Sequence, residues 1–163
     1  MNNHEVEKLL DDCWVDLNQA QTIIVGIGSY SNVVPYLTKY AIIKACGTIE
    51  TSFKMLVADY CEKRSKKQVK KFLESRVREN PCNPNLDNIC KILKDFDDNW
   101  NNNFKQRLNL NVDSVQLKTS LKSIVDARNE FAHGGNPASS FSNVIQYYTD
   151  CRKIIEILDS VII

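Results

Sequence analysis

The chain has 163 residues, of which 43% are hydrophobic and 25% charged, and its formal net charge is +1. These values describe a soluble globular protein of one domain, residues 1–163. The sequence shows no basic and apolar leader and no apolar run of about 18 residues. We therefore expect neither secretion nor membrane insertion, and a cytoplasmic location.

Amphipathic runs and the low content of glycine and proline predict an all-α fold of about five to six helices. Apolar residues spaced by three or four predict a first helix over residues 4–25. The same spacing predicts a second, strongly apolar helix over residues 36–62. Glu50 falls within the apolar stripe of this second helix, where a charge is costly without a partner.

A basic stretch follows the second helix. Residues Cys61–Glu79 hold eight basic and three acidic side chains, a local charge of +5. Phosphate contacts are local and are screened within about 10 Å, so this stretch is a candidate RNA contact. The alternative is a solvated helix face. The candidate RNA-binding residues are Lys63, Arg64, Lys66, Lys67, Lys70 and Lys71.

A short helix is predicted within this basic stretch. Ser65 and Gln68 have the spacing of a capping box at its start. Its apolar residues repeat at helical spacing, so we expect them to point inward; they are Val69, Phe72, Leu73 and Val77.

The second half of the chain predicts further helices over residues 85–96 and 140–162, both with apolar stripes. Between them, residues 97–109 are rich in asparagine, and we expect a loop or a short helix there. Asp113 is a candidate N-cap for the helix that follows. The segment after His133 is predicted to be a linker.

Reactive polar side chains converge at one place, Leu121–Gly135. In a helix, Asn129 and His133 share a face, and Arg128 lies within the core stripe, where it needs a partner. Gly134-Gly135 supplies the left-handed or flexible exit that ends a helix. The stripe contains Leu117, Leu121, Ile124, Val125, Phe131 and Ala132.

Glu50 and Arg128 are thus two charges of opposite sign on two core helices. One interpretation is that they pair, either within a subunit or close to an interface. The other is that Glu50 reaches water at the flank of its helix. The sequence leaves both open.

The Arg128-Asn129-x-x-x-His133 pattern, followed by glycine, resembles the R-N-x-x-x-H signature of HEPN domains. These are small helical domains, many of them metal-independent RNases in prokaryotic conflict systems. Lys39–Tyr60 resembles the early core helix of the RiboL-PSP-like HEPN branch, and Asn83–Trp100 resembles its middle segment. The resemblance covers roughly residues 36–160. It implies a HEPN-like helical bundle and a homodimer in which two motif helices face each other.

RNA cleavage without metal requires proton transfer and positive charge on the phosphate. His133 can transfer protons, Arg128 can hold phosphate oxygens, and Asn129 can orient either group. The resemblance implies an endoribonuclease, a toxin or abortive-infection effector, that leaves 2′,3′-cyclic phosphate ends. The alternatives are a non-catalytic module that binds RNA or protein, and a helical subunit completed by a partner such as an antitoxin.

Six cysteines without CxxC spacing, and only two histidines, give no pattern typical of a zinc site. We expect reduced thiols in the core, no metal and no cofactor.

Overall fold

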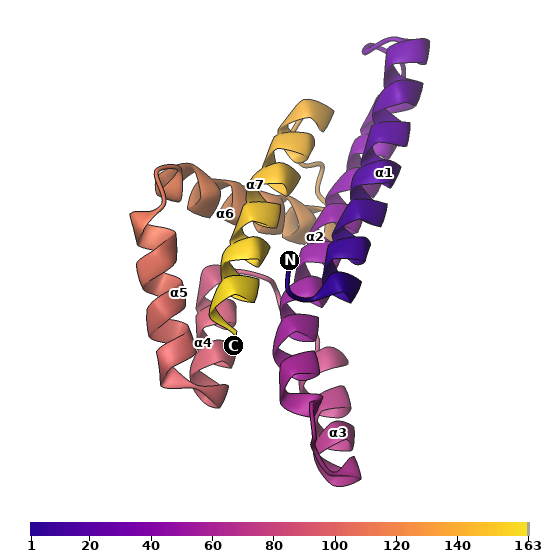
Figure 1. Ribbon diagram of the computed structural model, residues 1–163. Helices are drawn as coiled ribbons and strands as arrows, with labels where there is room; N and C mark the ends of the chain where they lie inside the picture. The colour runs from indigo at the N-terminus through magenta and orange to yellow at the C-terminus, as the bar shows by residue number, and fades with distance from the viewer. Residues whose placement is uncertain (163) are drawn as a thin grey trace.

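Seven α-helices and one π-helical turn form the described part of the chain, residues 1–162 of the computed structural model (Figure 1). No strand occurs in this part, so the all-α prediction is confirmed. No helix among these residues combines the length and apolar character needed to cross a membrane. The elements are α1 (His4–Ile27), α2 (Val34–Glu62), α3 (Lys67–Leu73), η1 (Glu74–Arg78), α4 (Leu86–Phe96), α5 (Asp98–Leu110), α6 (Ser114–Ala132) and α7 (Phe141–Val161).

The asparagine-rich segment forms a regular helix, α5, which brings the number of α-helices to seven. The side chain of Asp97 caps it by accepting a hydrogen bond of 2.6 Å from the backbone N–H of Asn99. Trp100, Phe104 and Leu108 repeat every four residues and are all buried. This apolar stripe fixes the helix despite the poor helix propensity of its asparagines.

Helix α7 lies at the centre of the bundle and packs against α1, α2, α5 and α6 (Figure 1). Tyr148, on its buried side, donates a hydrogen bond of 2.5 Å to the backbone carbonyl of Leu10 in α1. The predicted apolar stripe of this last helix is confirmed. Its buried members include Val144, Tyr148, Cys151, Ile155 and Leu158.

Asp150 is a buried carboxylate that joins α7 to α6 and so fixes the helix that carries the Arg-Asn-His motif. It accepts hydrogen bonds from the Ser120 hydroxyl at 2.6 Å and from the Gln116 amide at 3.1 Å. Gln146, one turn earlier on α7, donates a third at 3.1 Å. Three donors offset much of the desolvation of this carboxylate.

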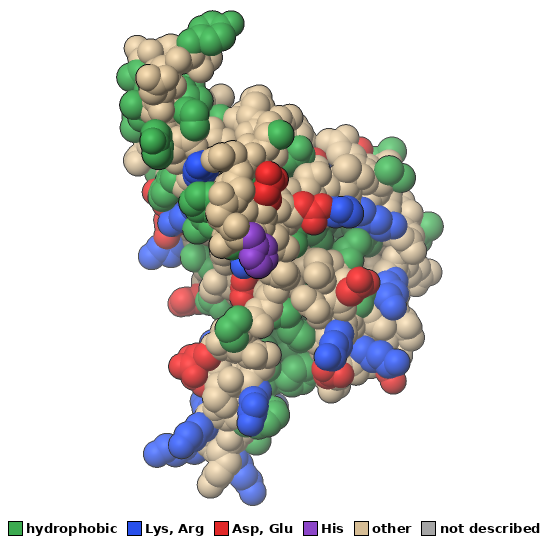
Figure 2. Space-filling model, turned by 180° about the vertical axis from the view of Figure 1, so that it is seen from behind, with side chains coloured by type: hydrophobic (Ala, Val, Ile, Leu, Met, Phe, Trp, Pro, Cys, Tyr) green, Lys and Arg blue, Asp and Glu red, His purple; other side chains and the backbone are tan. Residues whose placement is uncertain are grey.

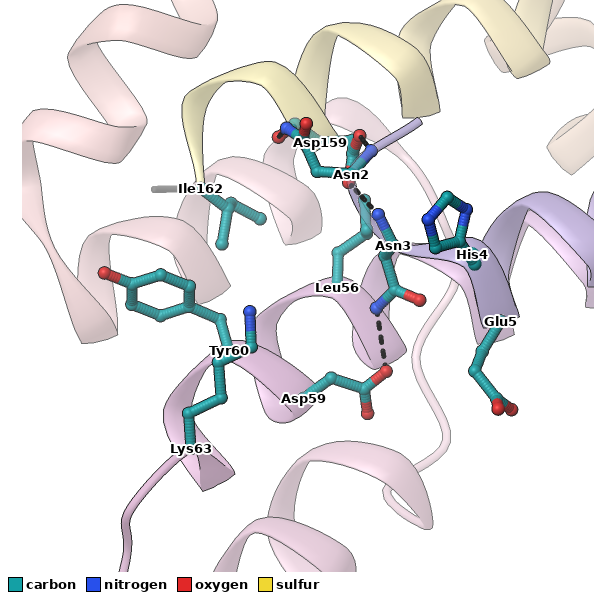
Figure 3. Close-up of a pocket in the computed structure, with 10 residues that line it drawn as sticks. All are labelled: Asn2, Asn3, His4, Glu5, Leu56, Asp59, Tyr60, Lys63, Asp159 and Ile162. Carbon is teal, nitrogen blue, oxygen red and sulfur yellow. Dashed lines mark hydrogen bonds between the residues drawn. The ribbon is translucent and has the colours of Figure 1, made fainter.

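The N-terminal segment is held against α7 and α2 by two aspartates (Figure 3). Asp159, which is buried, accepts hydrogen bonds from the backbone N–H groups of Asn2 and Asn3. The Asn3 side chain donates at 2.8 Å to Asp59 of α2. Lys63 lies at the edge of the resulting cavity of about 340 Å³.

Helices α1 and α2 form an antiparallel hairpin whose tip projects beyond the rest of the bundle (Figure 1). Hydrophobic side chains gather at this end of the molecule, and lysines and arginines gather at the opposite end, around α3 (Figure 2). Exposed hydrophobic residues in the half of the hairpin nearer its tip are Ile23, Val25, Ile27, Tyr30, Val33, Tyr36, Tyr40 and Ile43.

Three local predictions are wrong in whole or in part. The Ser65 hydroxyl bonds back to the carbonyl of Cys61, and α3 begins without a side-chain cap. Asp113 does occupy the N-cap position of α6, but its carboxylate pairs with Lys153 at 3.0 Å and makes no capping hydrogen bond. Of the residues expected to point inward around α3, Leu73 and Val77 are buried, whereas Val69 and Phe72 are exposed.

The six cysteines are all free, as predicted. Cys13, Cys46 and Cys151 are buried in the core, and the other three are half-buried.

Candidate functional site: the end of helix α6

The Arg-Asn-His motif occupies the last turn and a half of α6. The first part of the predicted core stripe, Leu117 to Val125, is buried, and Phe131 is half-buried. Ala132 is exposed, so its assignment to the core is wrong, and Ala127 is buried in its place. Core packing therefore ends one turn before the end of the helix, which leaves the last turn open to solvent.

Arg128 is half-buried and is held by the linker between η1 and α4. Its Nη2 donates a hydrogen bond to the Oδ1 of Asn83, while its Nε is buried without a hydrogen-bond partner. An asparagine amide can orient a guanidinium plane without neutralising its charge. Arg128 thus keeps a free positive charge in a fixed orientation.

Glu50 and Arg128 do not pair within the described chain, so the interpretation of a pair within one subunit is wrong, and a pair close to an interface stays a prediction. Glu50 instead pairs with Lys54, one turn along α2, at 2.5 Å. Glu50 also accepts the backbone N–H of Cys82 at 3.1 Å, and buried Lys54 donates to the Asn80 carbonyl at 2.6 Å. Glu50 thus binds the same linker that carries Asn83, and its support of the site stays a prediction.

Cys46 lies on α2 close to both charges. Burial raises the pKa of its thiol to about 11, and the nearby Arg128 guanidinium opposes that rise. The thiol therefore stays neutral near pH 7 and leaves the charge of Arg128 unpaired.

His133 ends α6 as its C-cap, and its side chain is exposed. Its backbone N–H bonds to the Asn129 carbonyl at 3.0 Å, and within residues 1–162 its ring makes no hydrogen bond. The predicted glycine exit is confirmed. Gly134 has a φ of +84°, and a Cβ on Gly135 would lie 2.7 Å from the Cγ of Glu130.

The linker after the motif is held by Lys39 of α2, a residue without an assigned role in the sequence analysis. Its Nζ donates to the Oδ1 of Asn136 at 2.7 Å and lies 5.3 Å from the centre of the Phe131 ring. Lys39 therefore places a second cation beside the exit of the motif helix. Because 97 residues separate Lys39 from Asn136, no local pattern could have indicated this contact.

The profile of the RiboL-PSP-HEPN family matches residues 5–163, nearly the whole chain. The chain belongs to this HEPN family. The match extends the resemblance seen in the sequence to include α1. No curated protein and no solved structure matches the chain significantly.

In this HEPN domain, Asn129 faces a cavity of about 450 Å³ beside the motif. Lys122 and Lys118 lie on the same face of α6, about two and three turns before Asn129, and also line the cavity. Lys122 pairs with Asp126, and Lys118 donates at 2.7 Å to Asn109. These lysines are additional cations in the wall of the same cavity, and they were not singled out from the sequence.

The basic stretch of the HEPN domain lies away from α6, at the far end of α2 (Figure 1). The candidate RNA-binding residues Lys63 to Lys71 are exposed. Arg78 differs, because it is half-buried and bonds to Asp59 and Glu62 at 2.6 Å each and to Glu74 at 3.0 Å. The structure therefore does not bring the basic stretch to the motif. Within residues 1–162, no three acidic, histidine or cysteine side chains are grouped as metal ligands would be.

Proposed function

We propose that the chain is a metal-independent endoribonuclease of the HEPN type. The observation that carries this proposal is the exposed His133 ring at the end of a helix that also presents Arg128 and Asn129. Family membership supports it, because HEPN domains are often ribonucleases. A purely structural helix end has no need for an unbonded imidazole in that position.

In the proposed reaction, the ribose 2′-oxygen attacks the adjacent phosphorus while a base removes the 2′-hydroxyl proton. The bond from phosphorus to the 5′-oxygen breaks, and that oxygen takes up a proton. The products are a 2′,3′-cyclic phosphate and a 5′-hydroxyl. His133 supplies proton transfer, Arg128 stabilises charge on the phosphate oxygens, and Asn129 orients the phosphate.

One copy of the chain has a single histidine in the motif, whereas the reaction needs both a base and an acid. We therefore propose a homodimer with a composite site. Tyr36, Tyr40 and Ile43 form an exposed apolar stripe on α2 at helical spacing, with exposed fractions of 72%, 48% and 43%. The stripe runs beside Lys39, which holds the linker after the motif, and we assign the dimer contact to it.

We further propose a role in conflict, as a toxin or anti-phage effector acting on RNA and restrained by an antitoxin or another regulatory protein. The exposed cations of the basic stretch, from Lys63 to Lys71, would attract RNA to the domain by their local charge.

One observation favours an alternative function. The bond between Arg128 and Asn83 gives Arg128 a structural role in joining α6 to the linker before α4. A module that only binds RNA or protein could retain Arg128 for this purpose.

The first prediction tests cleavage directly. The wild-type protein should cleave mixed RNA in the presence of EDTA, and the fragments should carry cyclic phosphate and 5′-hydroxyl ends. His133→Ala should lose cleavage by at least about a hundredfold, the usual contribution of a positioned acid or base. His4→Ala is the matched control, because His4 is exposed and distant in sequence from the motif. Equal cleavage by the two variants would contradict the proposal, and RNA binding without cleavage would favour the alternative.

A further inference from the structure

A third cavity, of about 570 Å³, lies between α3, η1, the following linker and α4. Phe72 and Phe96 line it from different helices, and both rings are exposed, by 58% and 37%. Phe72 was expected to point inward, but neither ring is buried by the described chain. Exposed aromatic rings on a cavity offer stacking surfaces.

The π-helical turn shapes this cavity. Its hydrogen bond runs from the N–H of Glu79 to the carbonyl of Glu74 at 2.9 Å, five residues apart. This turn directs Arg78 toward Asp59 and Glu62, whereas Arg76 lines the cavity. Such turns are rare and often occur at functional sites.

Amide groups at the wall of the cavity are available to a ligand. Asn83 uses its Oδ1 for Arg128, and Asn88 uses its Nδ2 for the carbonyl of Asn83 at 2.9 Å. In the described structure, the Asn83 Nδ2 and the Asn88 Oδ1 make no hydrogen bond. One donor and one acceptor therefore remain, a set that suits the edge of a nucleobase.

Charge in the cavity favours a phosphate near its rim. Arg76 and Lys91 are exposed cations that line it, and Asp95 is the single carboxylate. The two cations can contact phosphate oxygens, and the carboxylate can accept an N–H from a base.

We propose that this cavity binds one unpaired nucleotide of single-stranded RNA, with its base stacked on Phe72 or Phe96. This inference rests on the proposed function for the choice of RNA as the ligand. Asn83 lies in the cavity and also bonds to Arg128, so the bound nucleotide sits next to the residue assigned to the scissile phosphate. The cavity thus selects unpaired RNA, because a base within a duplex cannot enter and stack on these rings.

The test measures binding separately from cleavage. The affinity of a fluorescently labelled single-stranded RNA and of its duplex is measured in a His133→Ala background, so that the RNA stays intact. Phe72→Ala and Phe96→Ala should each weaken single-strand binding by about fivefold to a hundredfold and leave duplex binding unchanged. Phe72→Trp should restore the affinity, because it restores a ring. Leu110→Ala is the matched control, an exposed apolar residue at 77% that lies outside the cavity.

The outcomes separate this inference from the proposed function. Unchanged single-strand affinity in both phenylalanine variants, or equal losses for single strand and duplex, would overturn the nucleotide site even if the wild type cleaves RNA. Loss of single-strand affinity together with an inactive wild type would support the site and refute the ribonuclease. A wild type that binds no RNA would overturn the site.

Discussion

Arg128 is held in a fixed orientation and also keeps its positive charge. Its Nη2 is bonded to Asn83, which fixes the guanidinium, and no carboxylate among residues 1–162 forms an ion pair with it. A charged residue in a partly apolar environment needs hydrogen bonds. A neutral asparagine amide supplies one without cancelling the positive charge of the guanidinium. The linker before α4 is therefore a structural part of the motif, although it lies 45 residues earlier in the chain.

At the residue scale, three glycines give a matched set of predictions. Gly135→Ala should lower the free energy of unfolding by about 1–3 kcal/mol, because its Cβ would lie 2.9 Å from the backbone oxygen of Glu130. Gly134→Ala should lower it by about 1 kcal/mol, because of its φ of +84°. Gly47→Ala should raise it by about 0.5–1 kcal/mol, because Gly47 lies inside α2 with no neighbour within 4 Å of a Cβ. Urea denaturation of the three variants measures all three values.

The same set has a functional readout. Gly135→Ala should also reduce RNA cleavage, because it displaces the linker beside His133, whereas Gly47→Ala should leave cleavage unchanged. A Gly135→Ala protein as stable and as active as the wild type would show that the close approach to Glu130 has no consequence.

The motif residues Arg128, Asn129 and His133 could be identified from the sequence because their spacing within one helix is local information. Asn83 and Lys39 could not be identified in this way. Each acts through a contact with a residue 45 or 97 positions away, and only the packing of α2, α6 and the linker creates those contacts. Sequence periodicity likewise placed Glu50 within the apolar stripe of α2. The pairing of Glu50 with Lys54, however, depends on the linker that both residues bind.

At the scale of elements, the long helices were predicted well and the short ones poorly. The boundaries of α2 and α7 follow from apolar stripes of more than five turns. In a stripe of this length, one misassigned residue hardly changes the predicted limits of the helix. The region of α3 and η1 is short, and its π turn breaks the 3.6-residue period. Val69 and Phe72 precede the π turn, in the 7-residue helix α3, where Leu73 alone is buried, so two turns of helix hold too little of the apolar pattern to predict the inward face.

Arg78 anchors η1 to α2, and this contact should depend on pH. The hydrogen bond from Arg78 holds the pKa of Glu62 below its ordinary value of 4.5. A lowered folded-state pKa stabilises the protein above about pH 4.5, and this contribution is lost as the pH falls through the folded-state value. Arg78→Ala should therefore lower the free energy of unfolding at pH 7 by about 1 kcal/mol after solvent screening.

The difference in stability between wild type and Arg78→Ala should shrink as the pH falls below 4.5, and urea denaturation across pH 3–7 measures it. Arg76→Ala is the matched control, because Arg76 is exposed and forms no ion pair among the described residues. A difference that stays constant with pH would show that Glu62 does not depend on Arg78.

At the scale of the whole molecule, the dimer proposal predicts that a charge in the α2 stripe disrupts both assembly and activity. Tyr36→Glu with Tyr40→Glu should convert a dimer into a folded monomer and abolish RNA cleavage, because buried carboxylates would face each other across the contact. Mass in solution and the cleavage assay measure the two effects. Val115→Glu is the control, since Val115 is exposed by 80% and lies on α6 outside the stripe.

A Tyr36→Glu, Tyr40→Glu protein that remains dimeric would place the contact on another face. A monomeric wild type that still cleaves RNA would remove the need for a composite site.

Helix α2 connects the apolar hairpin tip to the basic stretch, and its 29 residues span roughly 43 Å. Concentrated salts act in opposite senses at these two ends. They displace phosphate from lysine and arginine side chains, and strongly hydrated anions such as sulfate strengthen apolar association. Concentrated ammonium sulfate that removes nucleic acid from the basic stretch should therefore also promote self-association of the protein through the apolar hairpin tip.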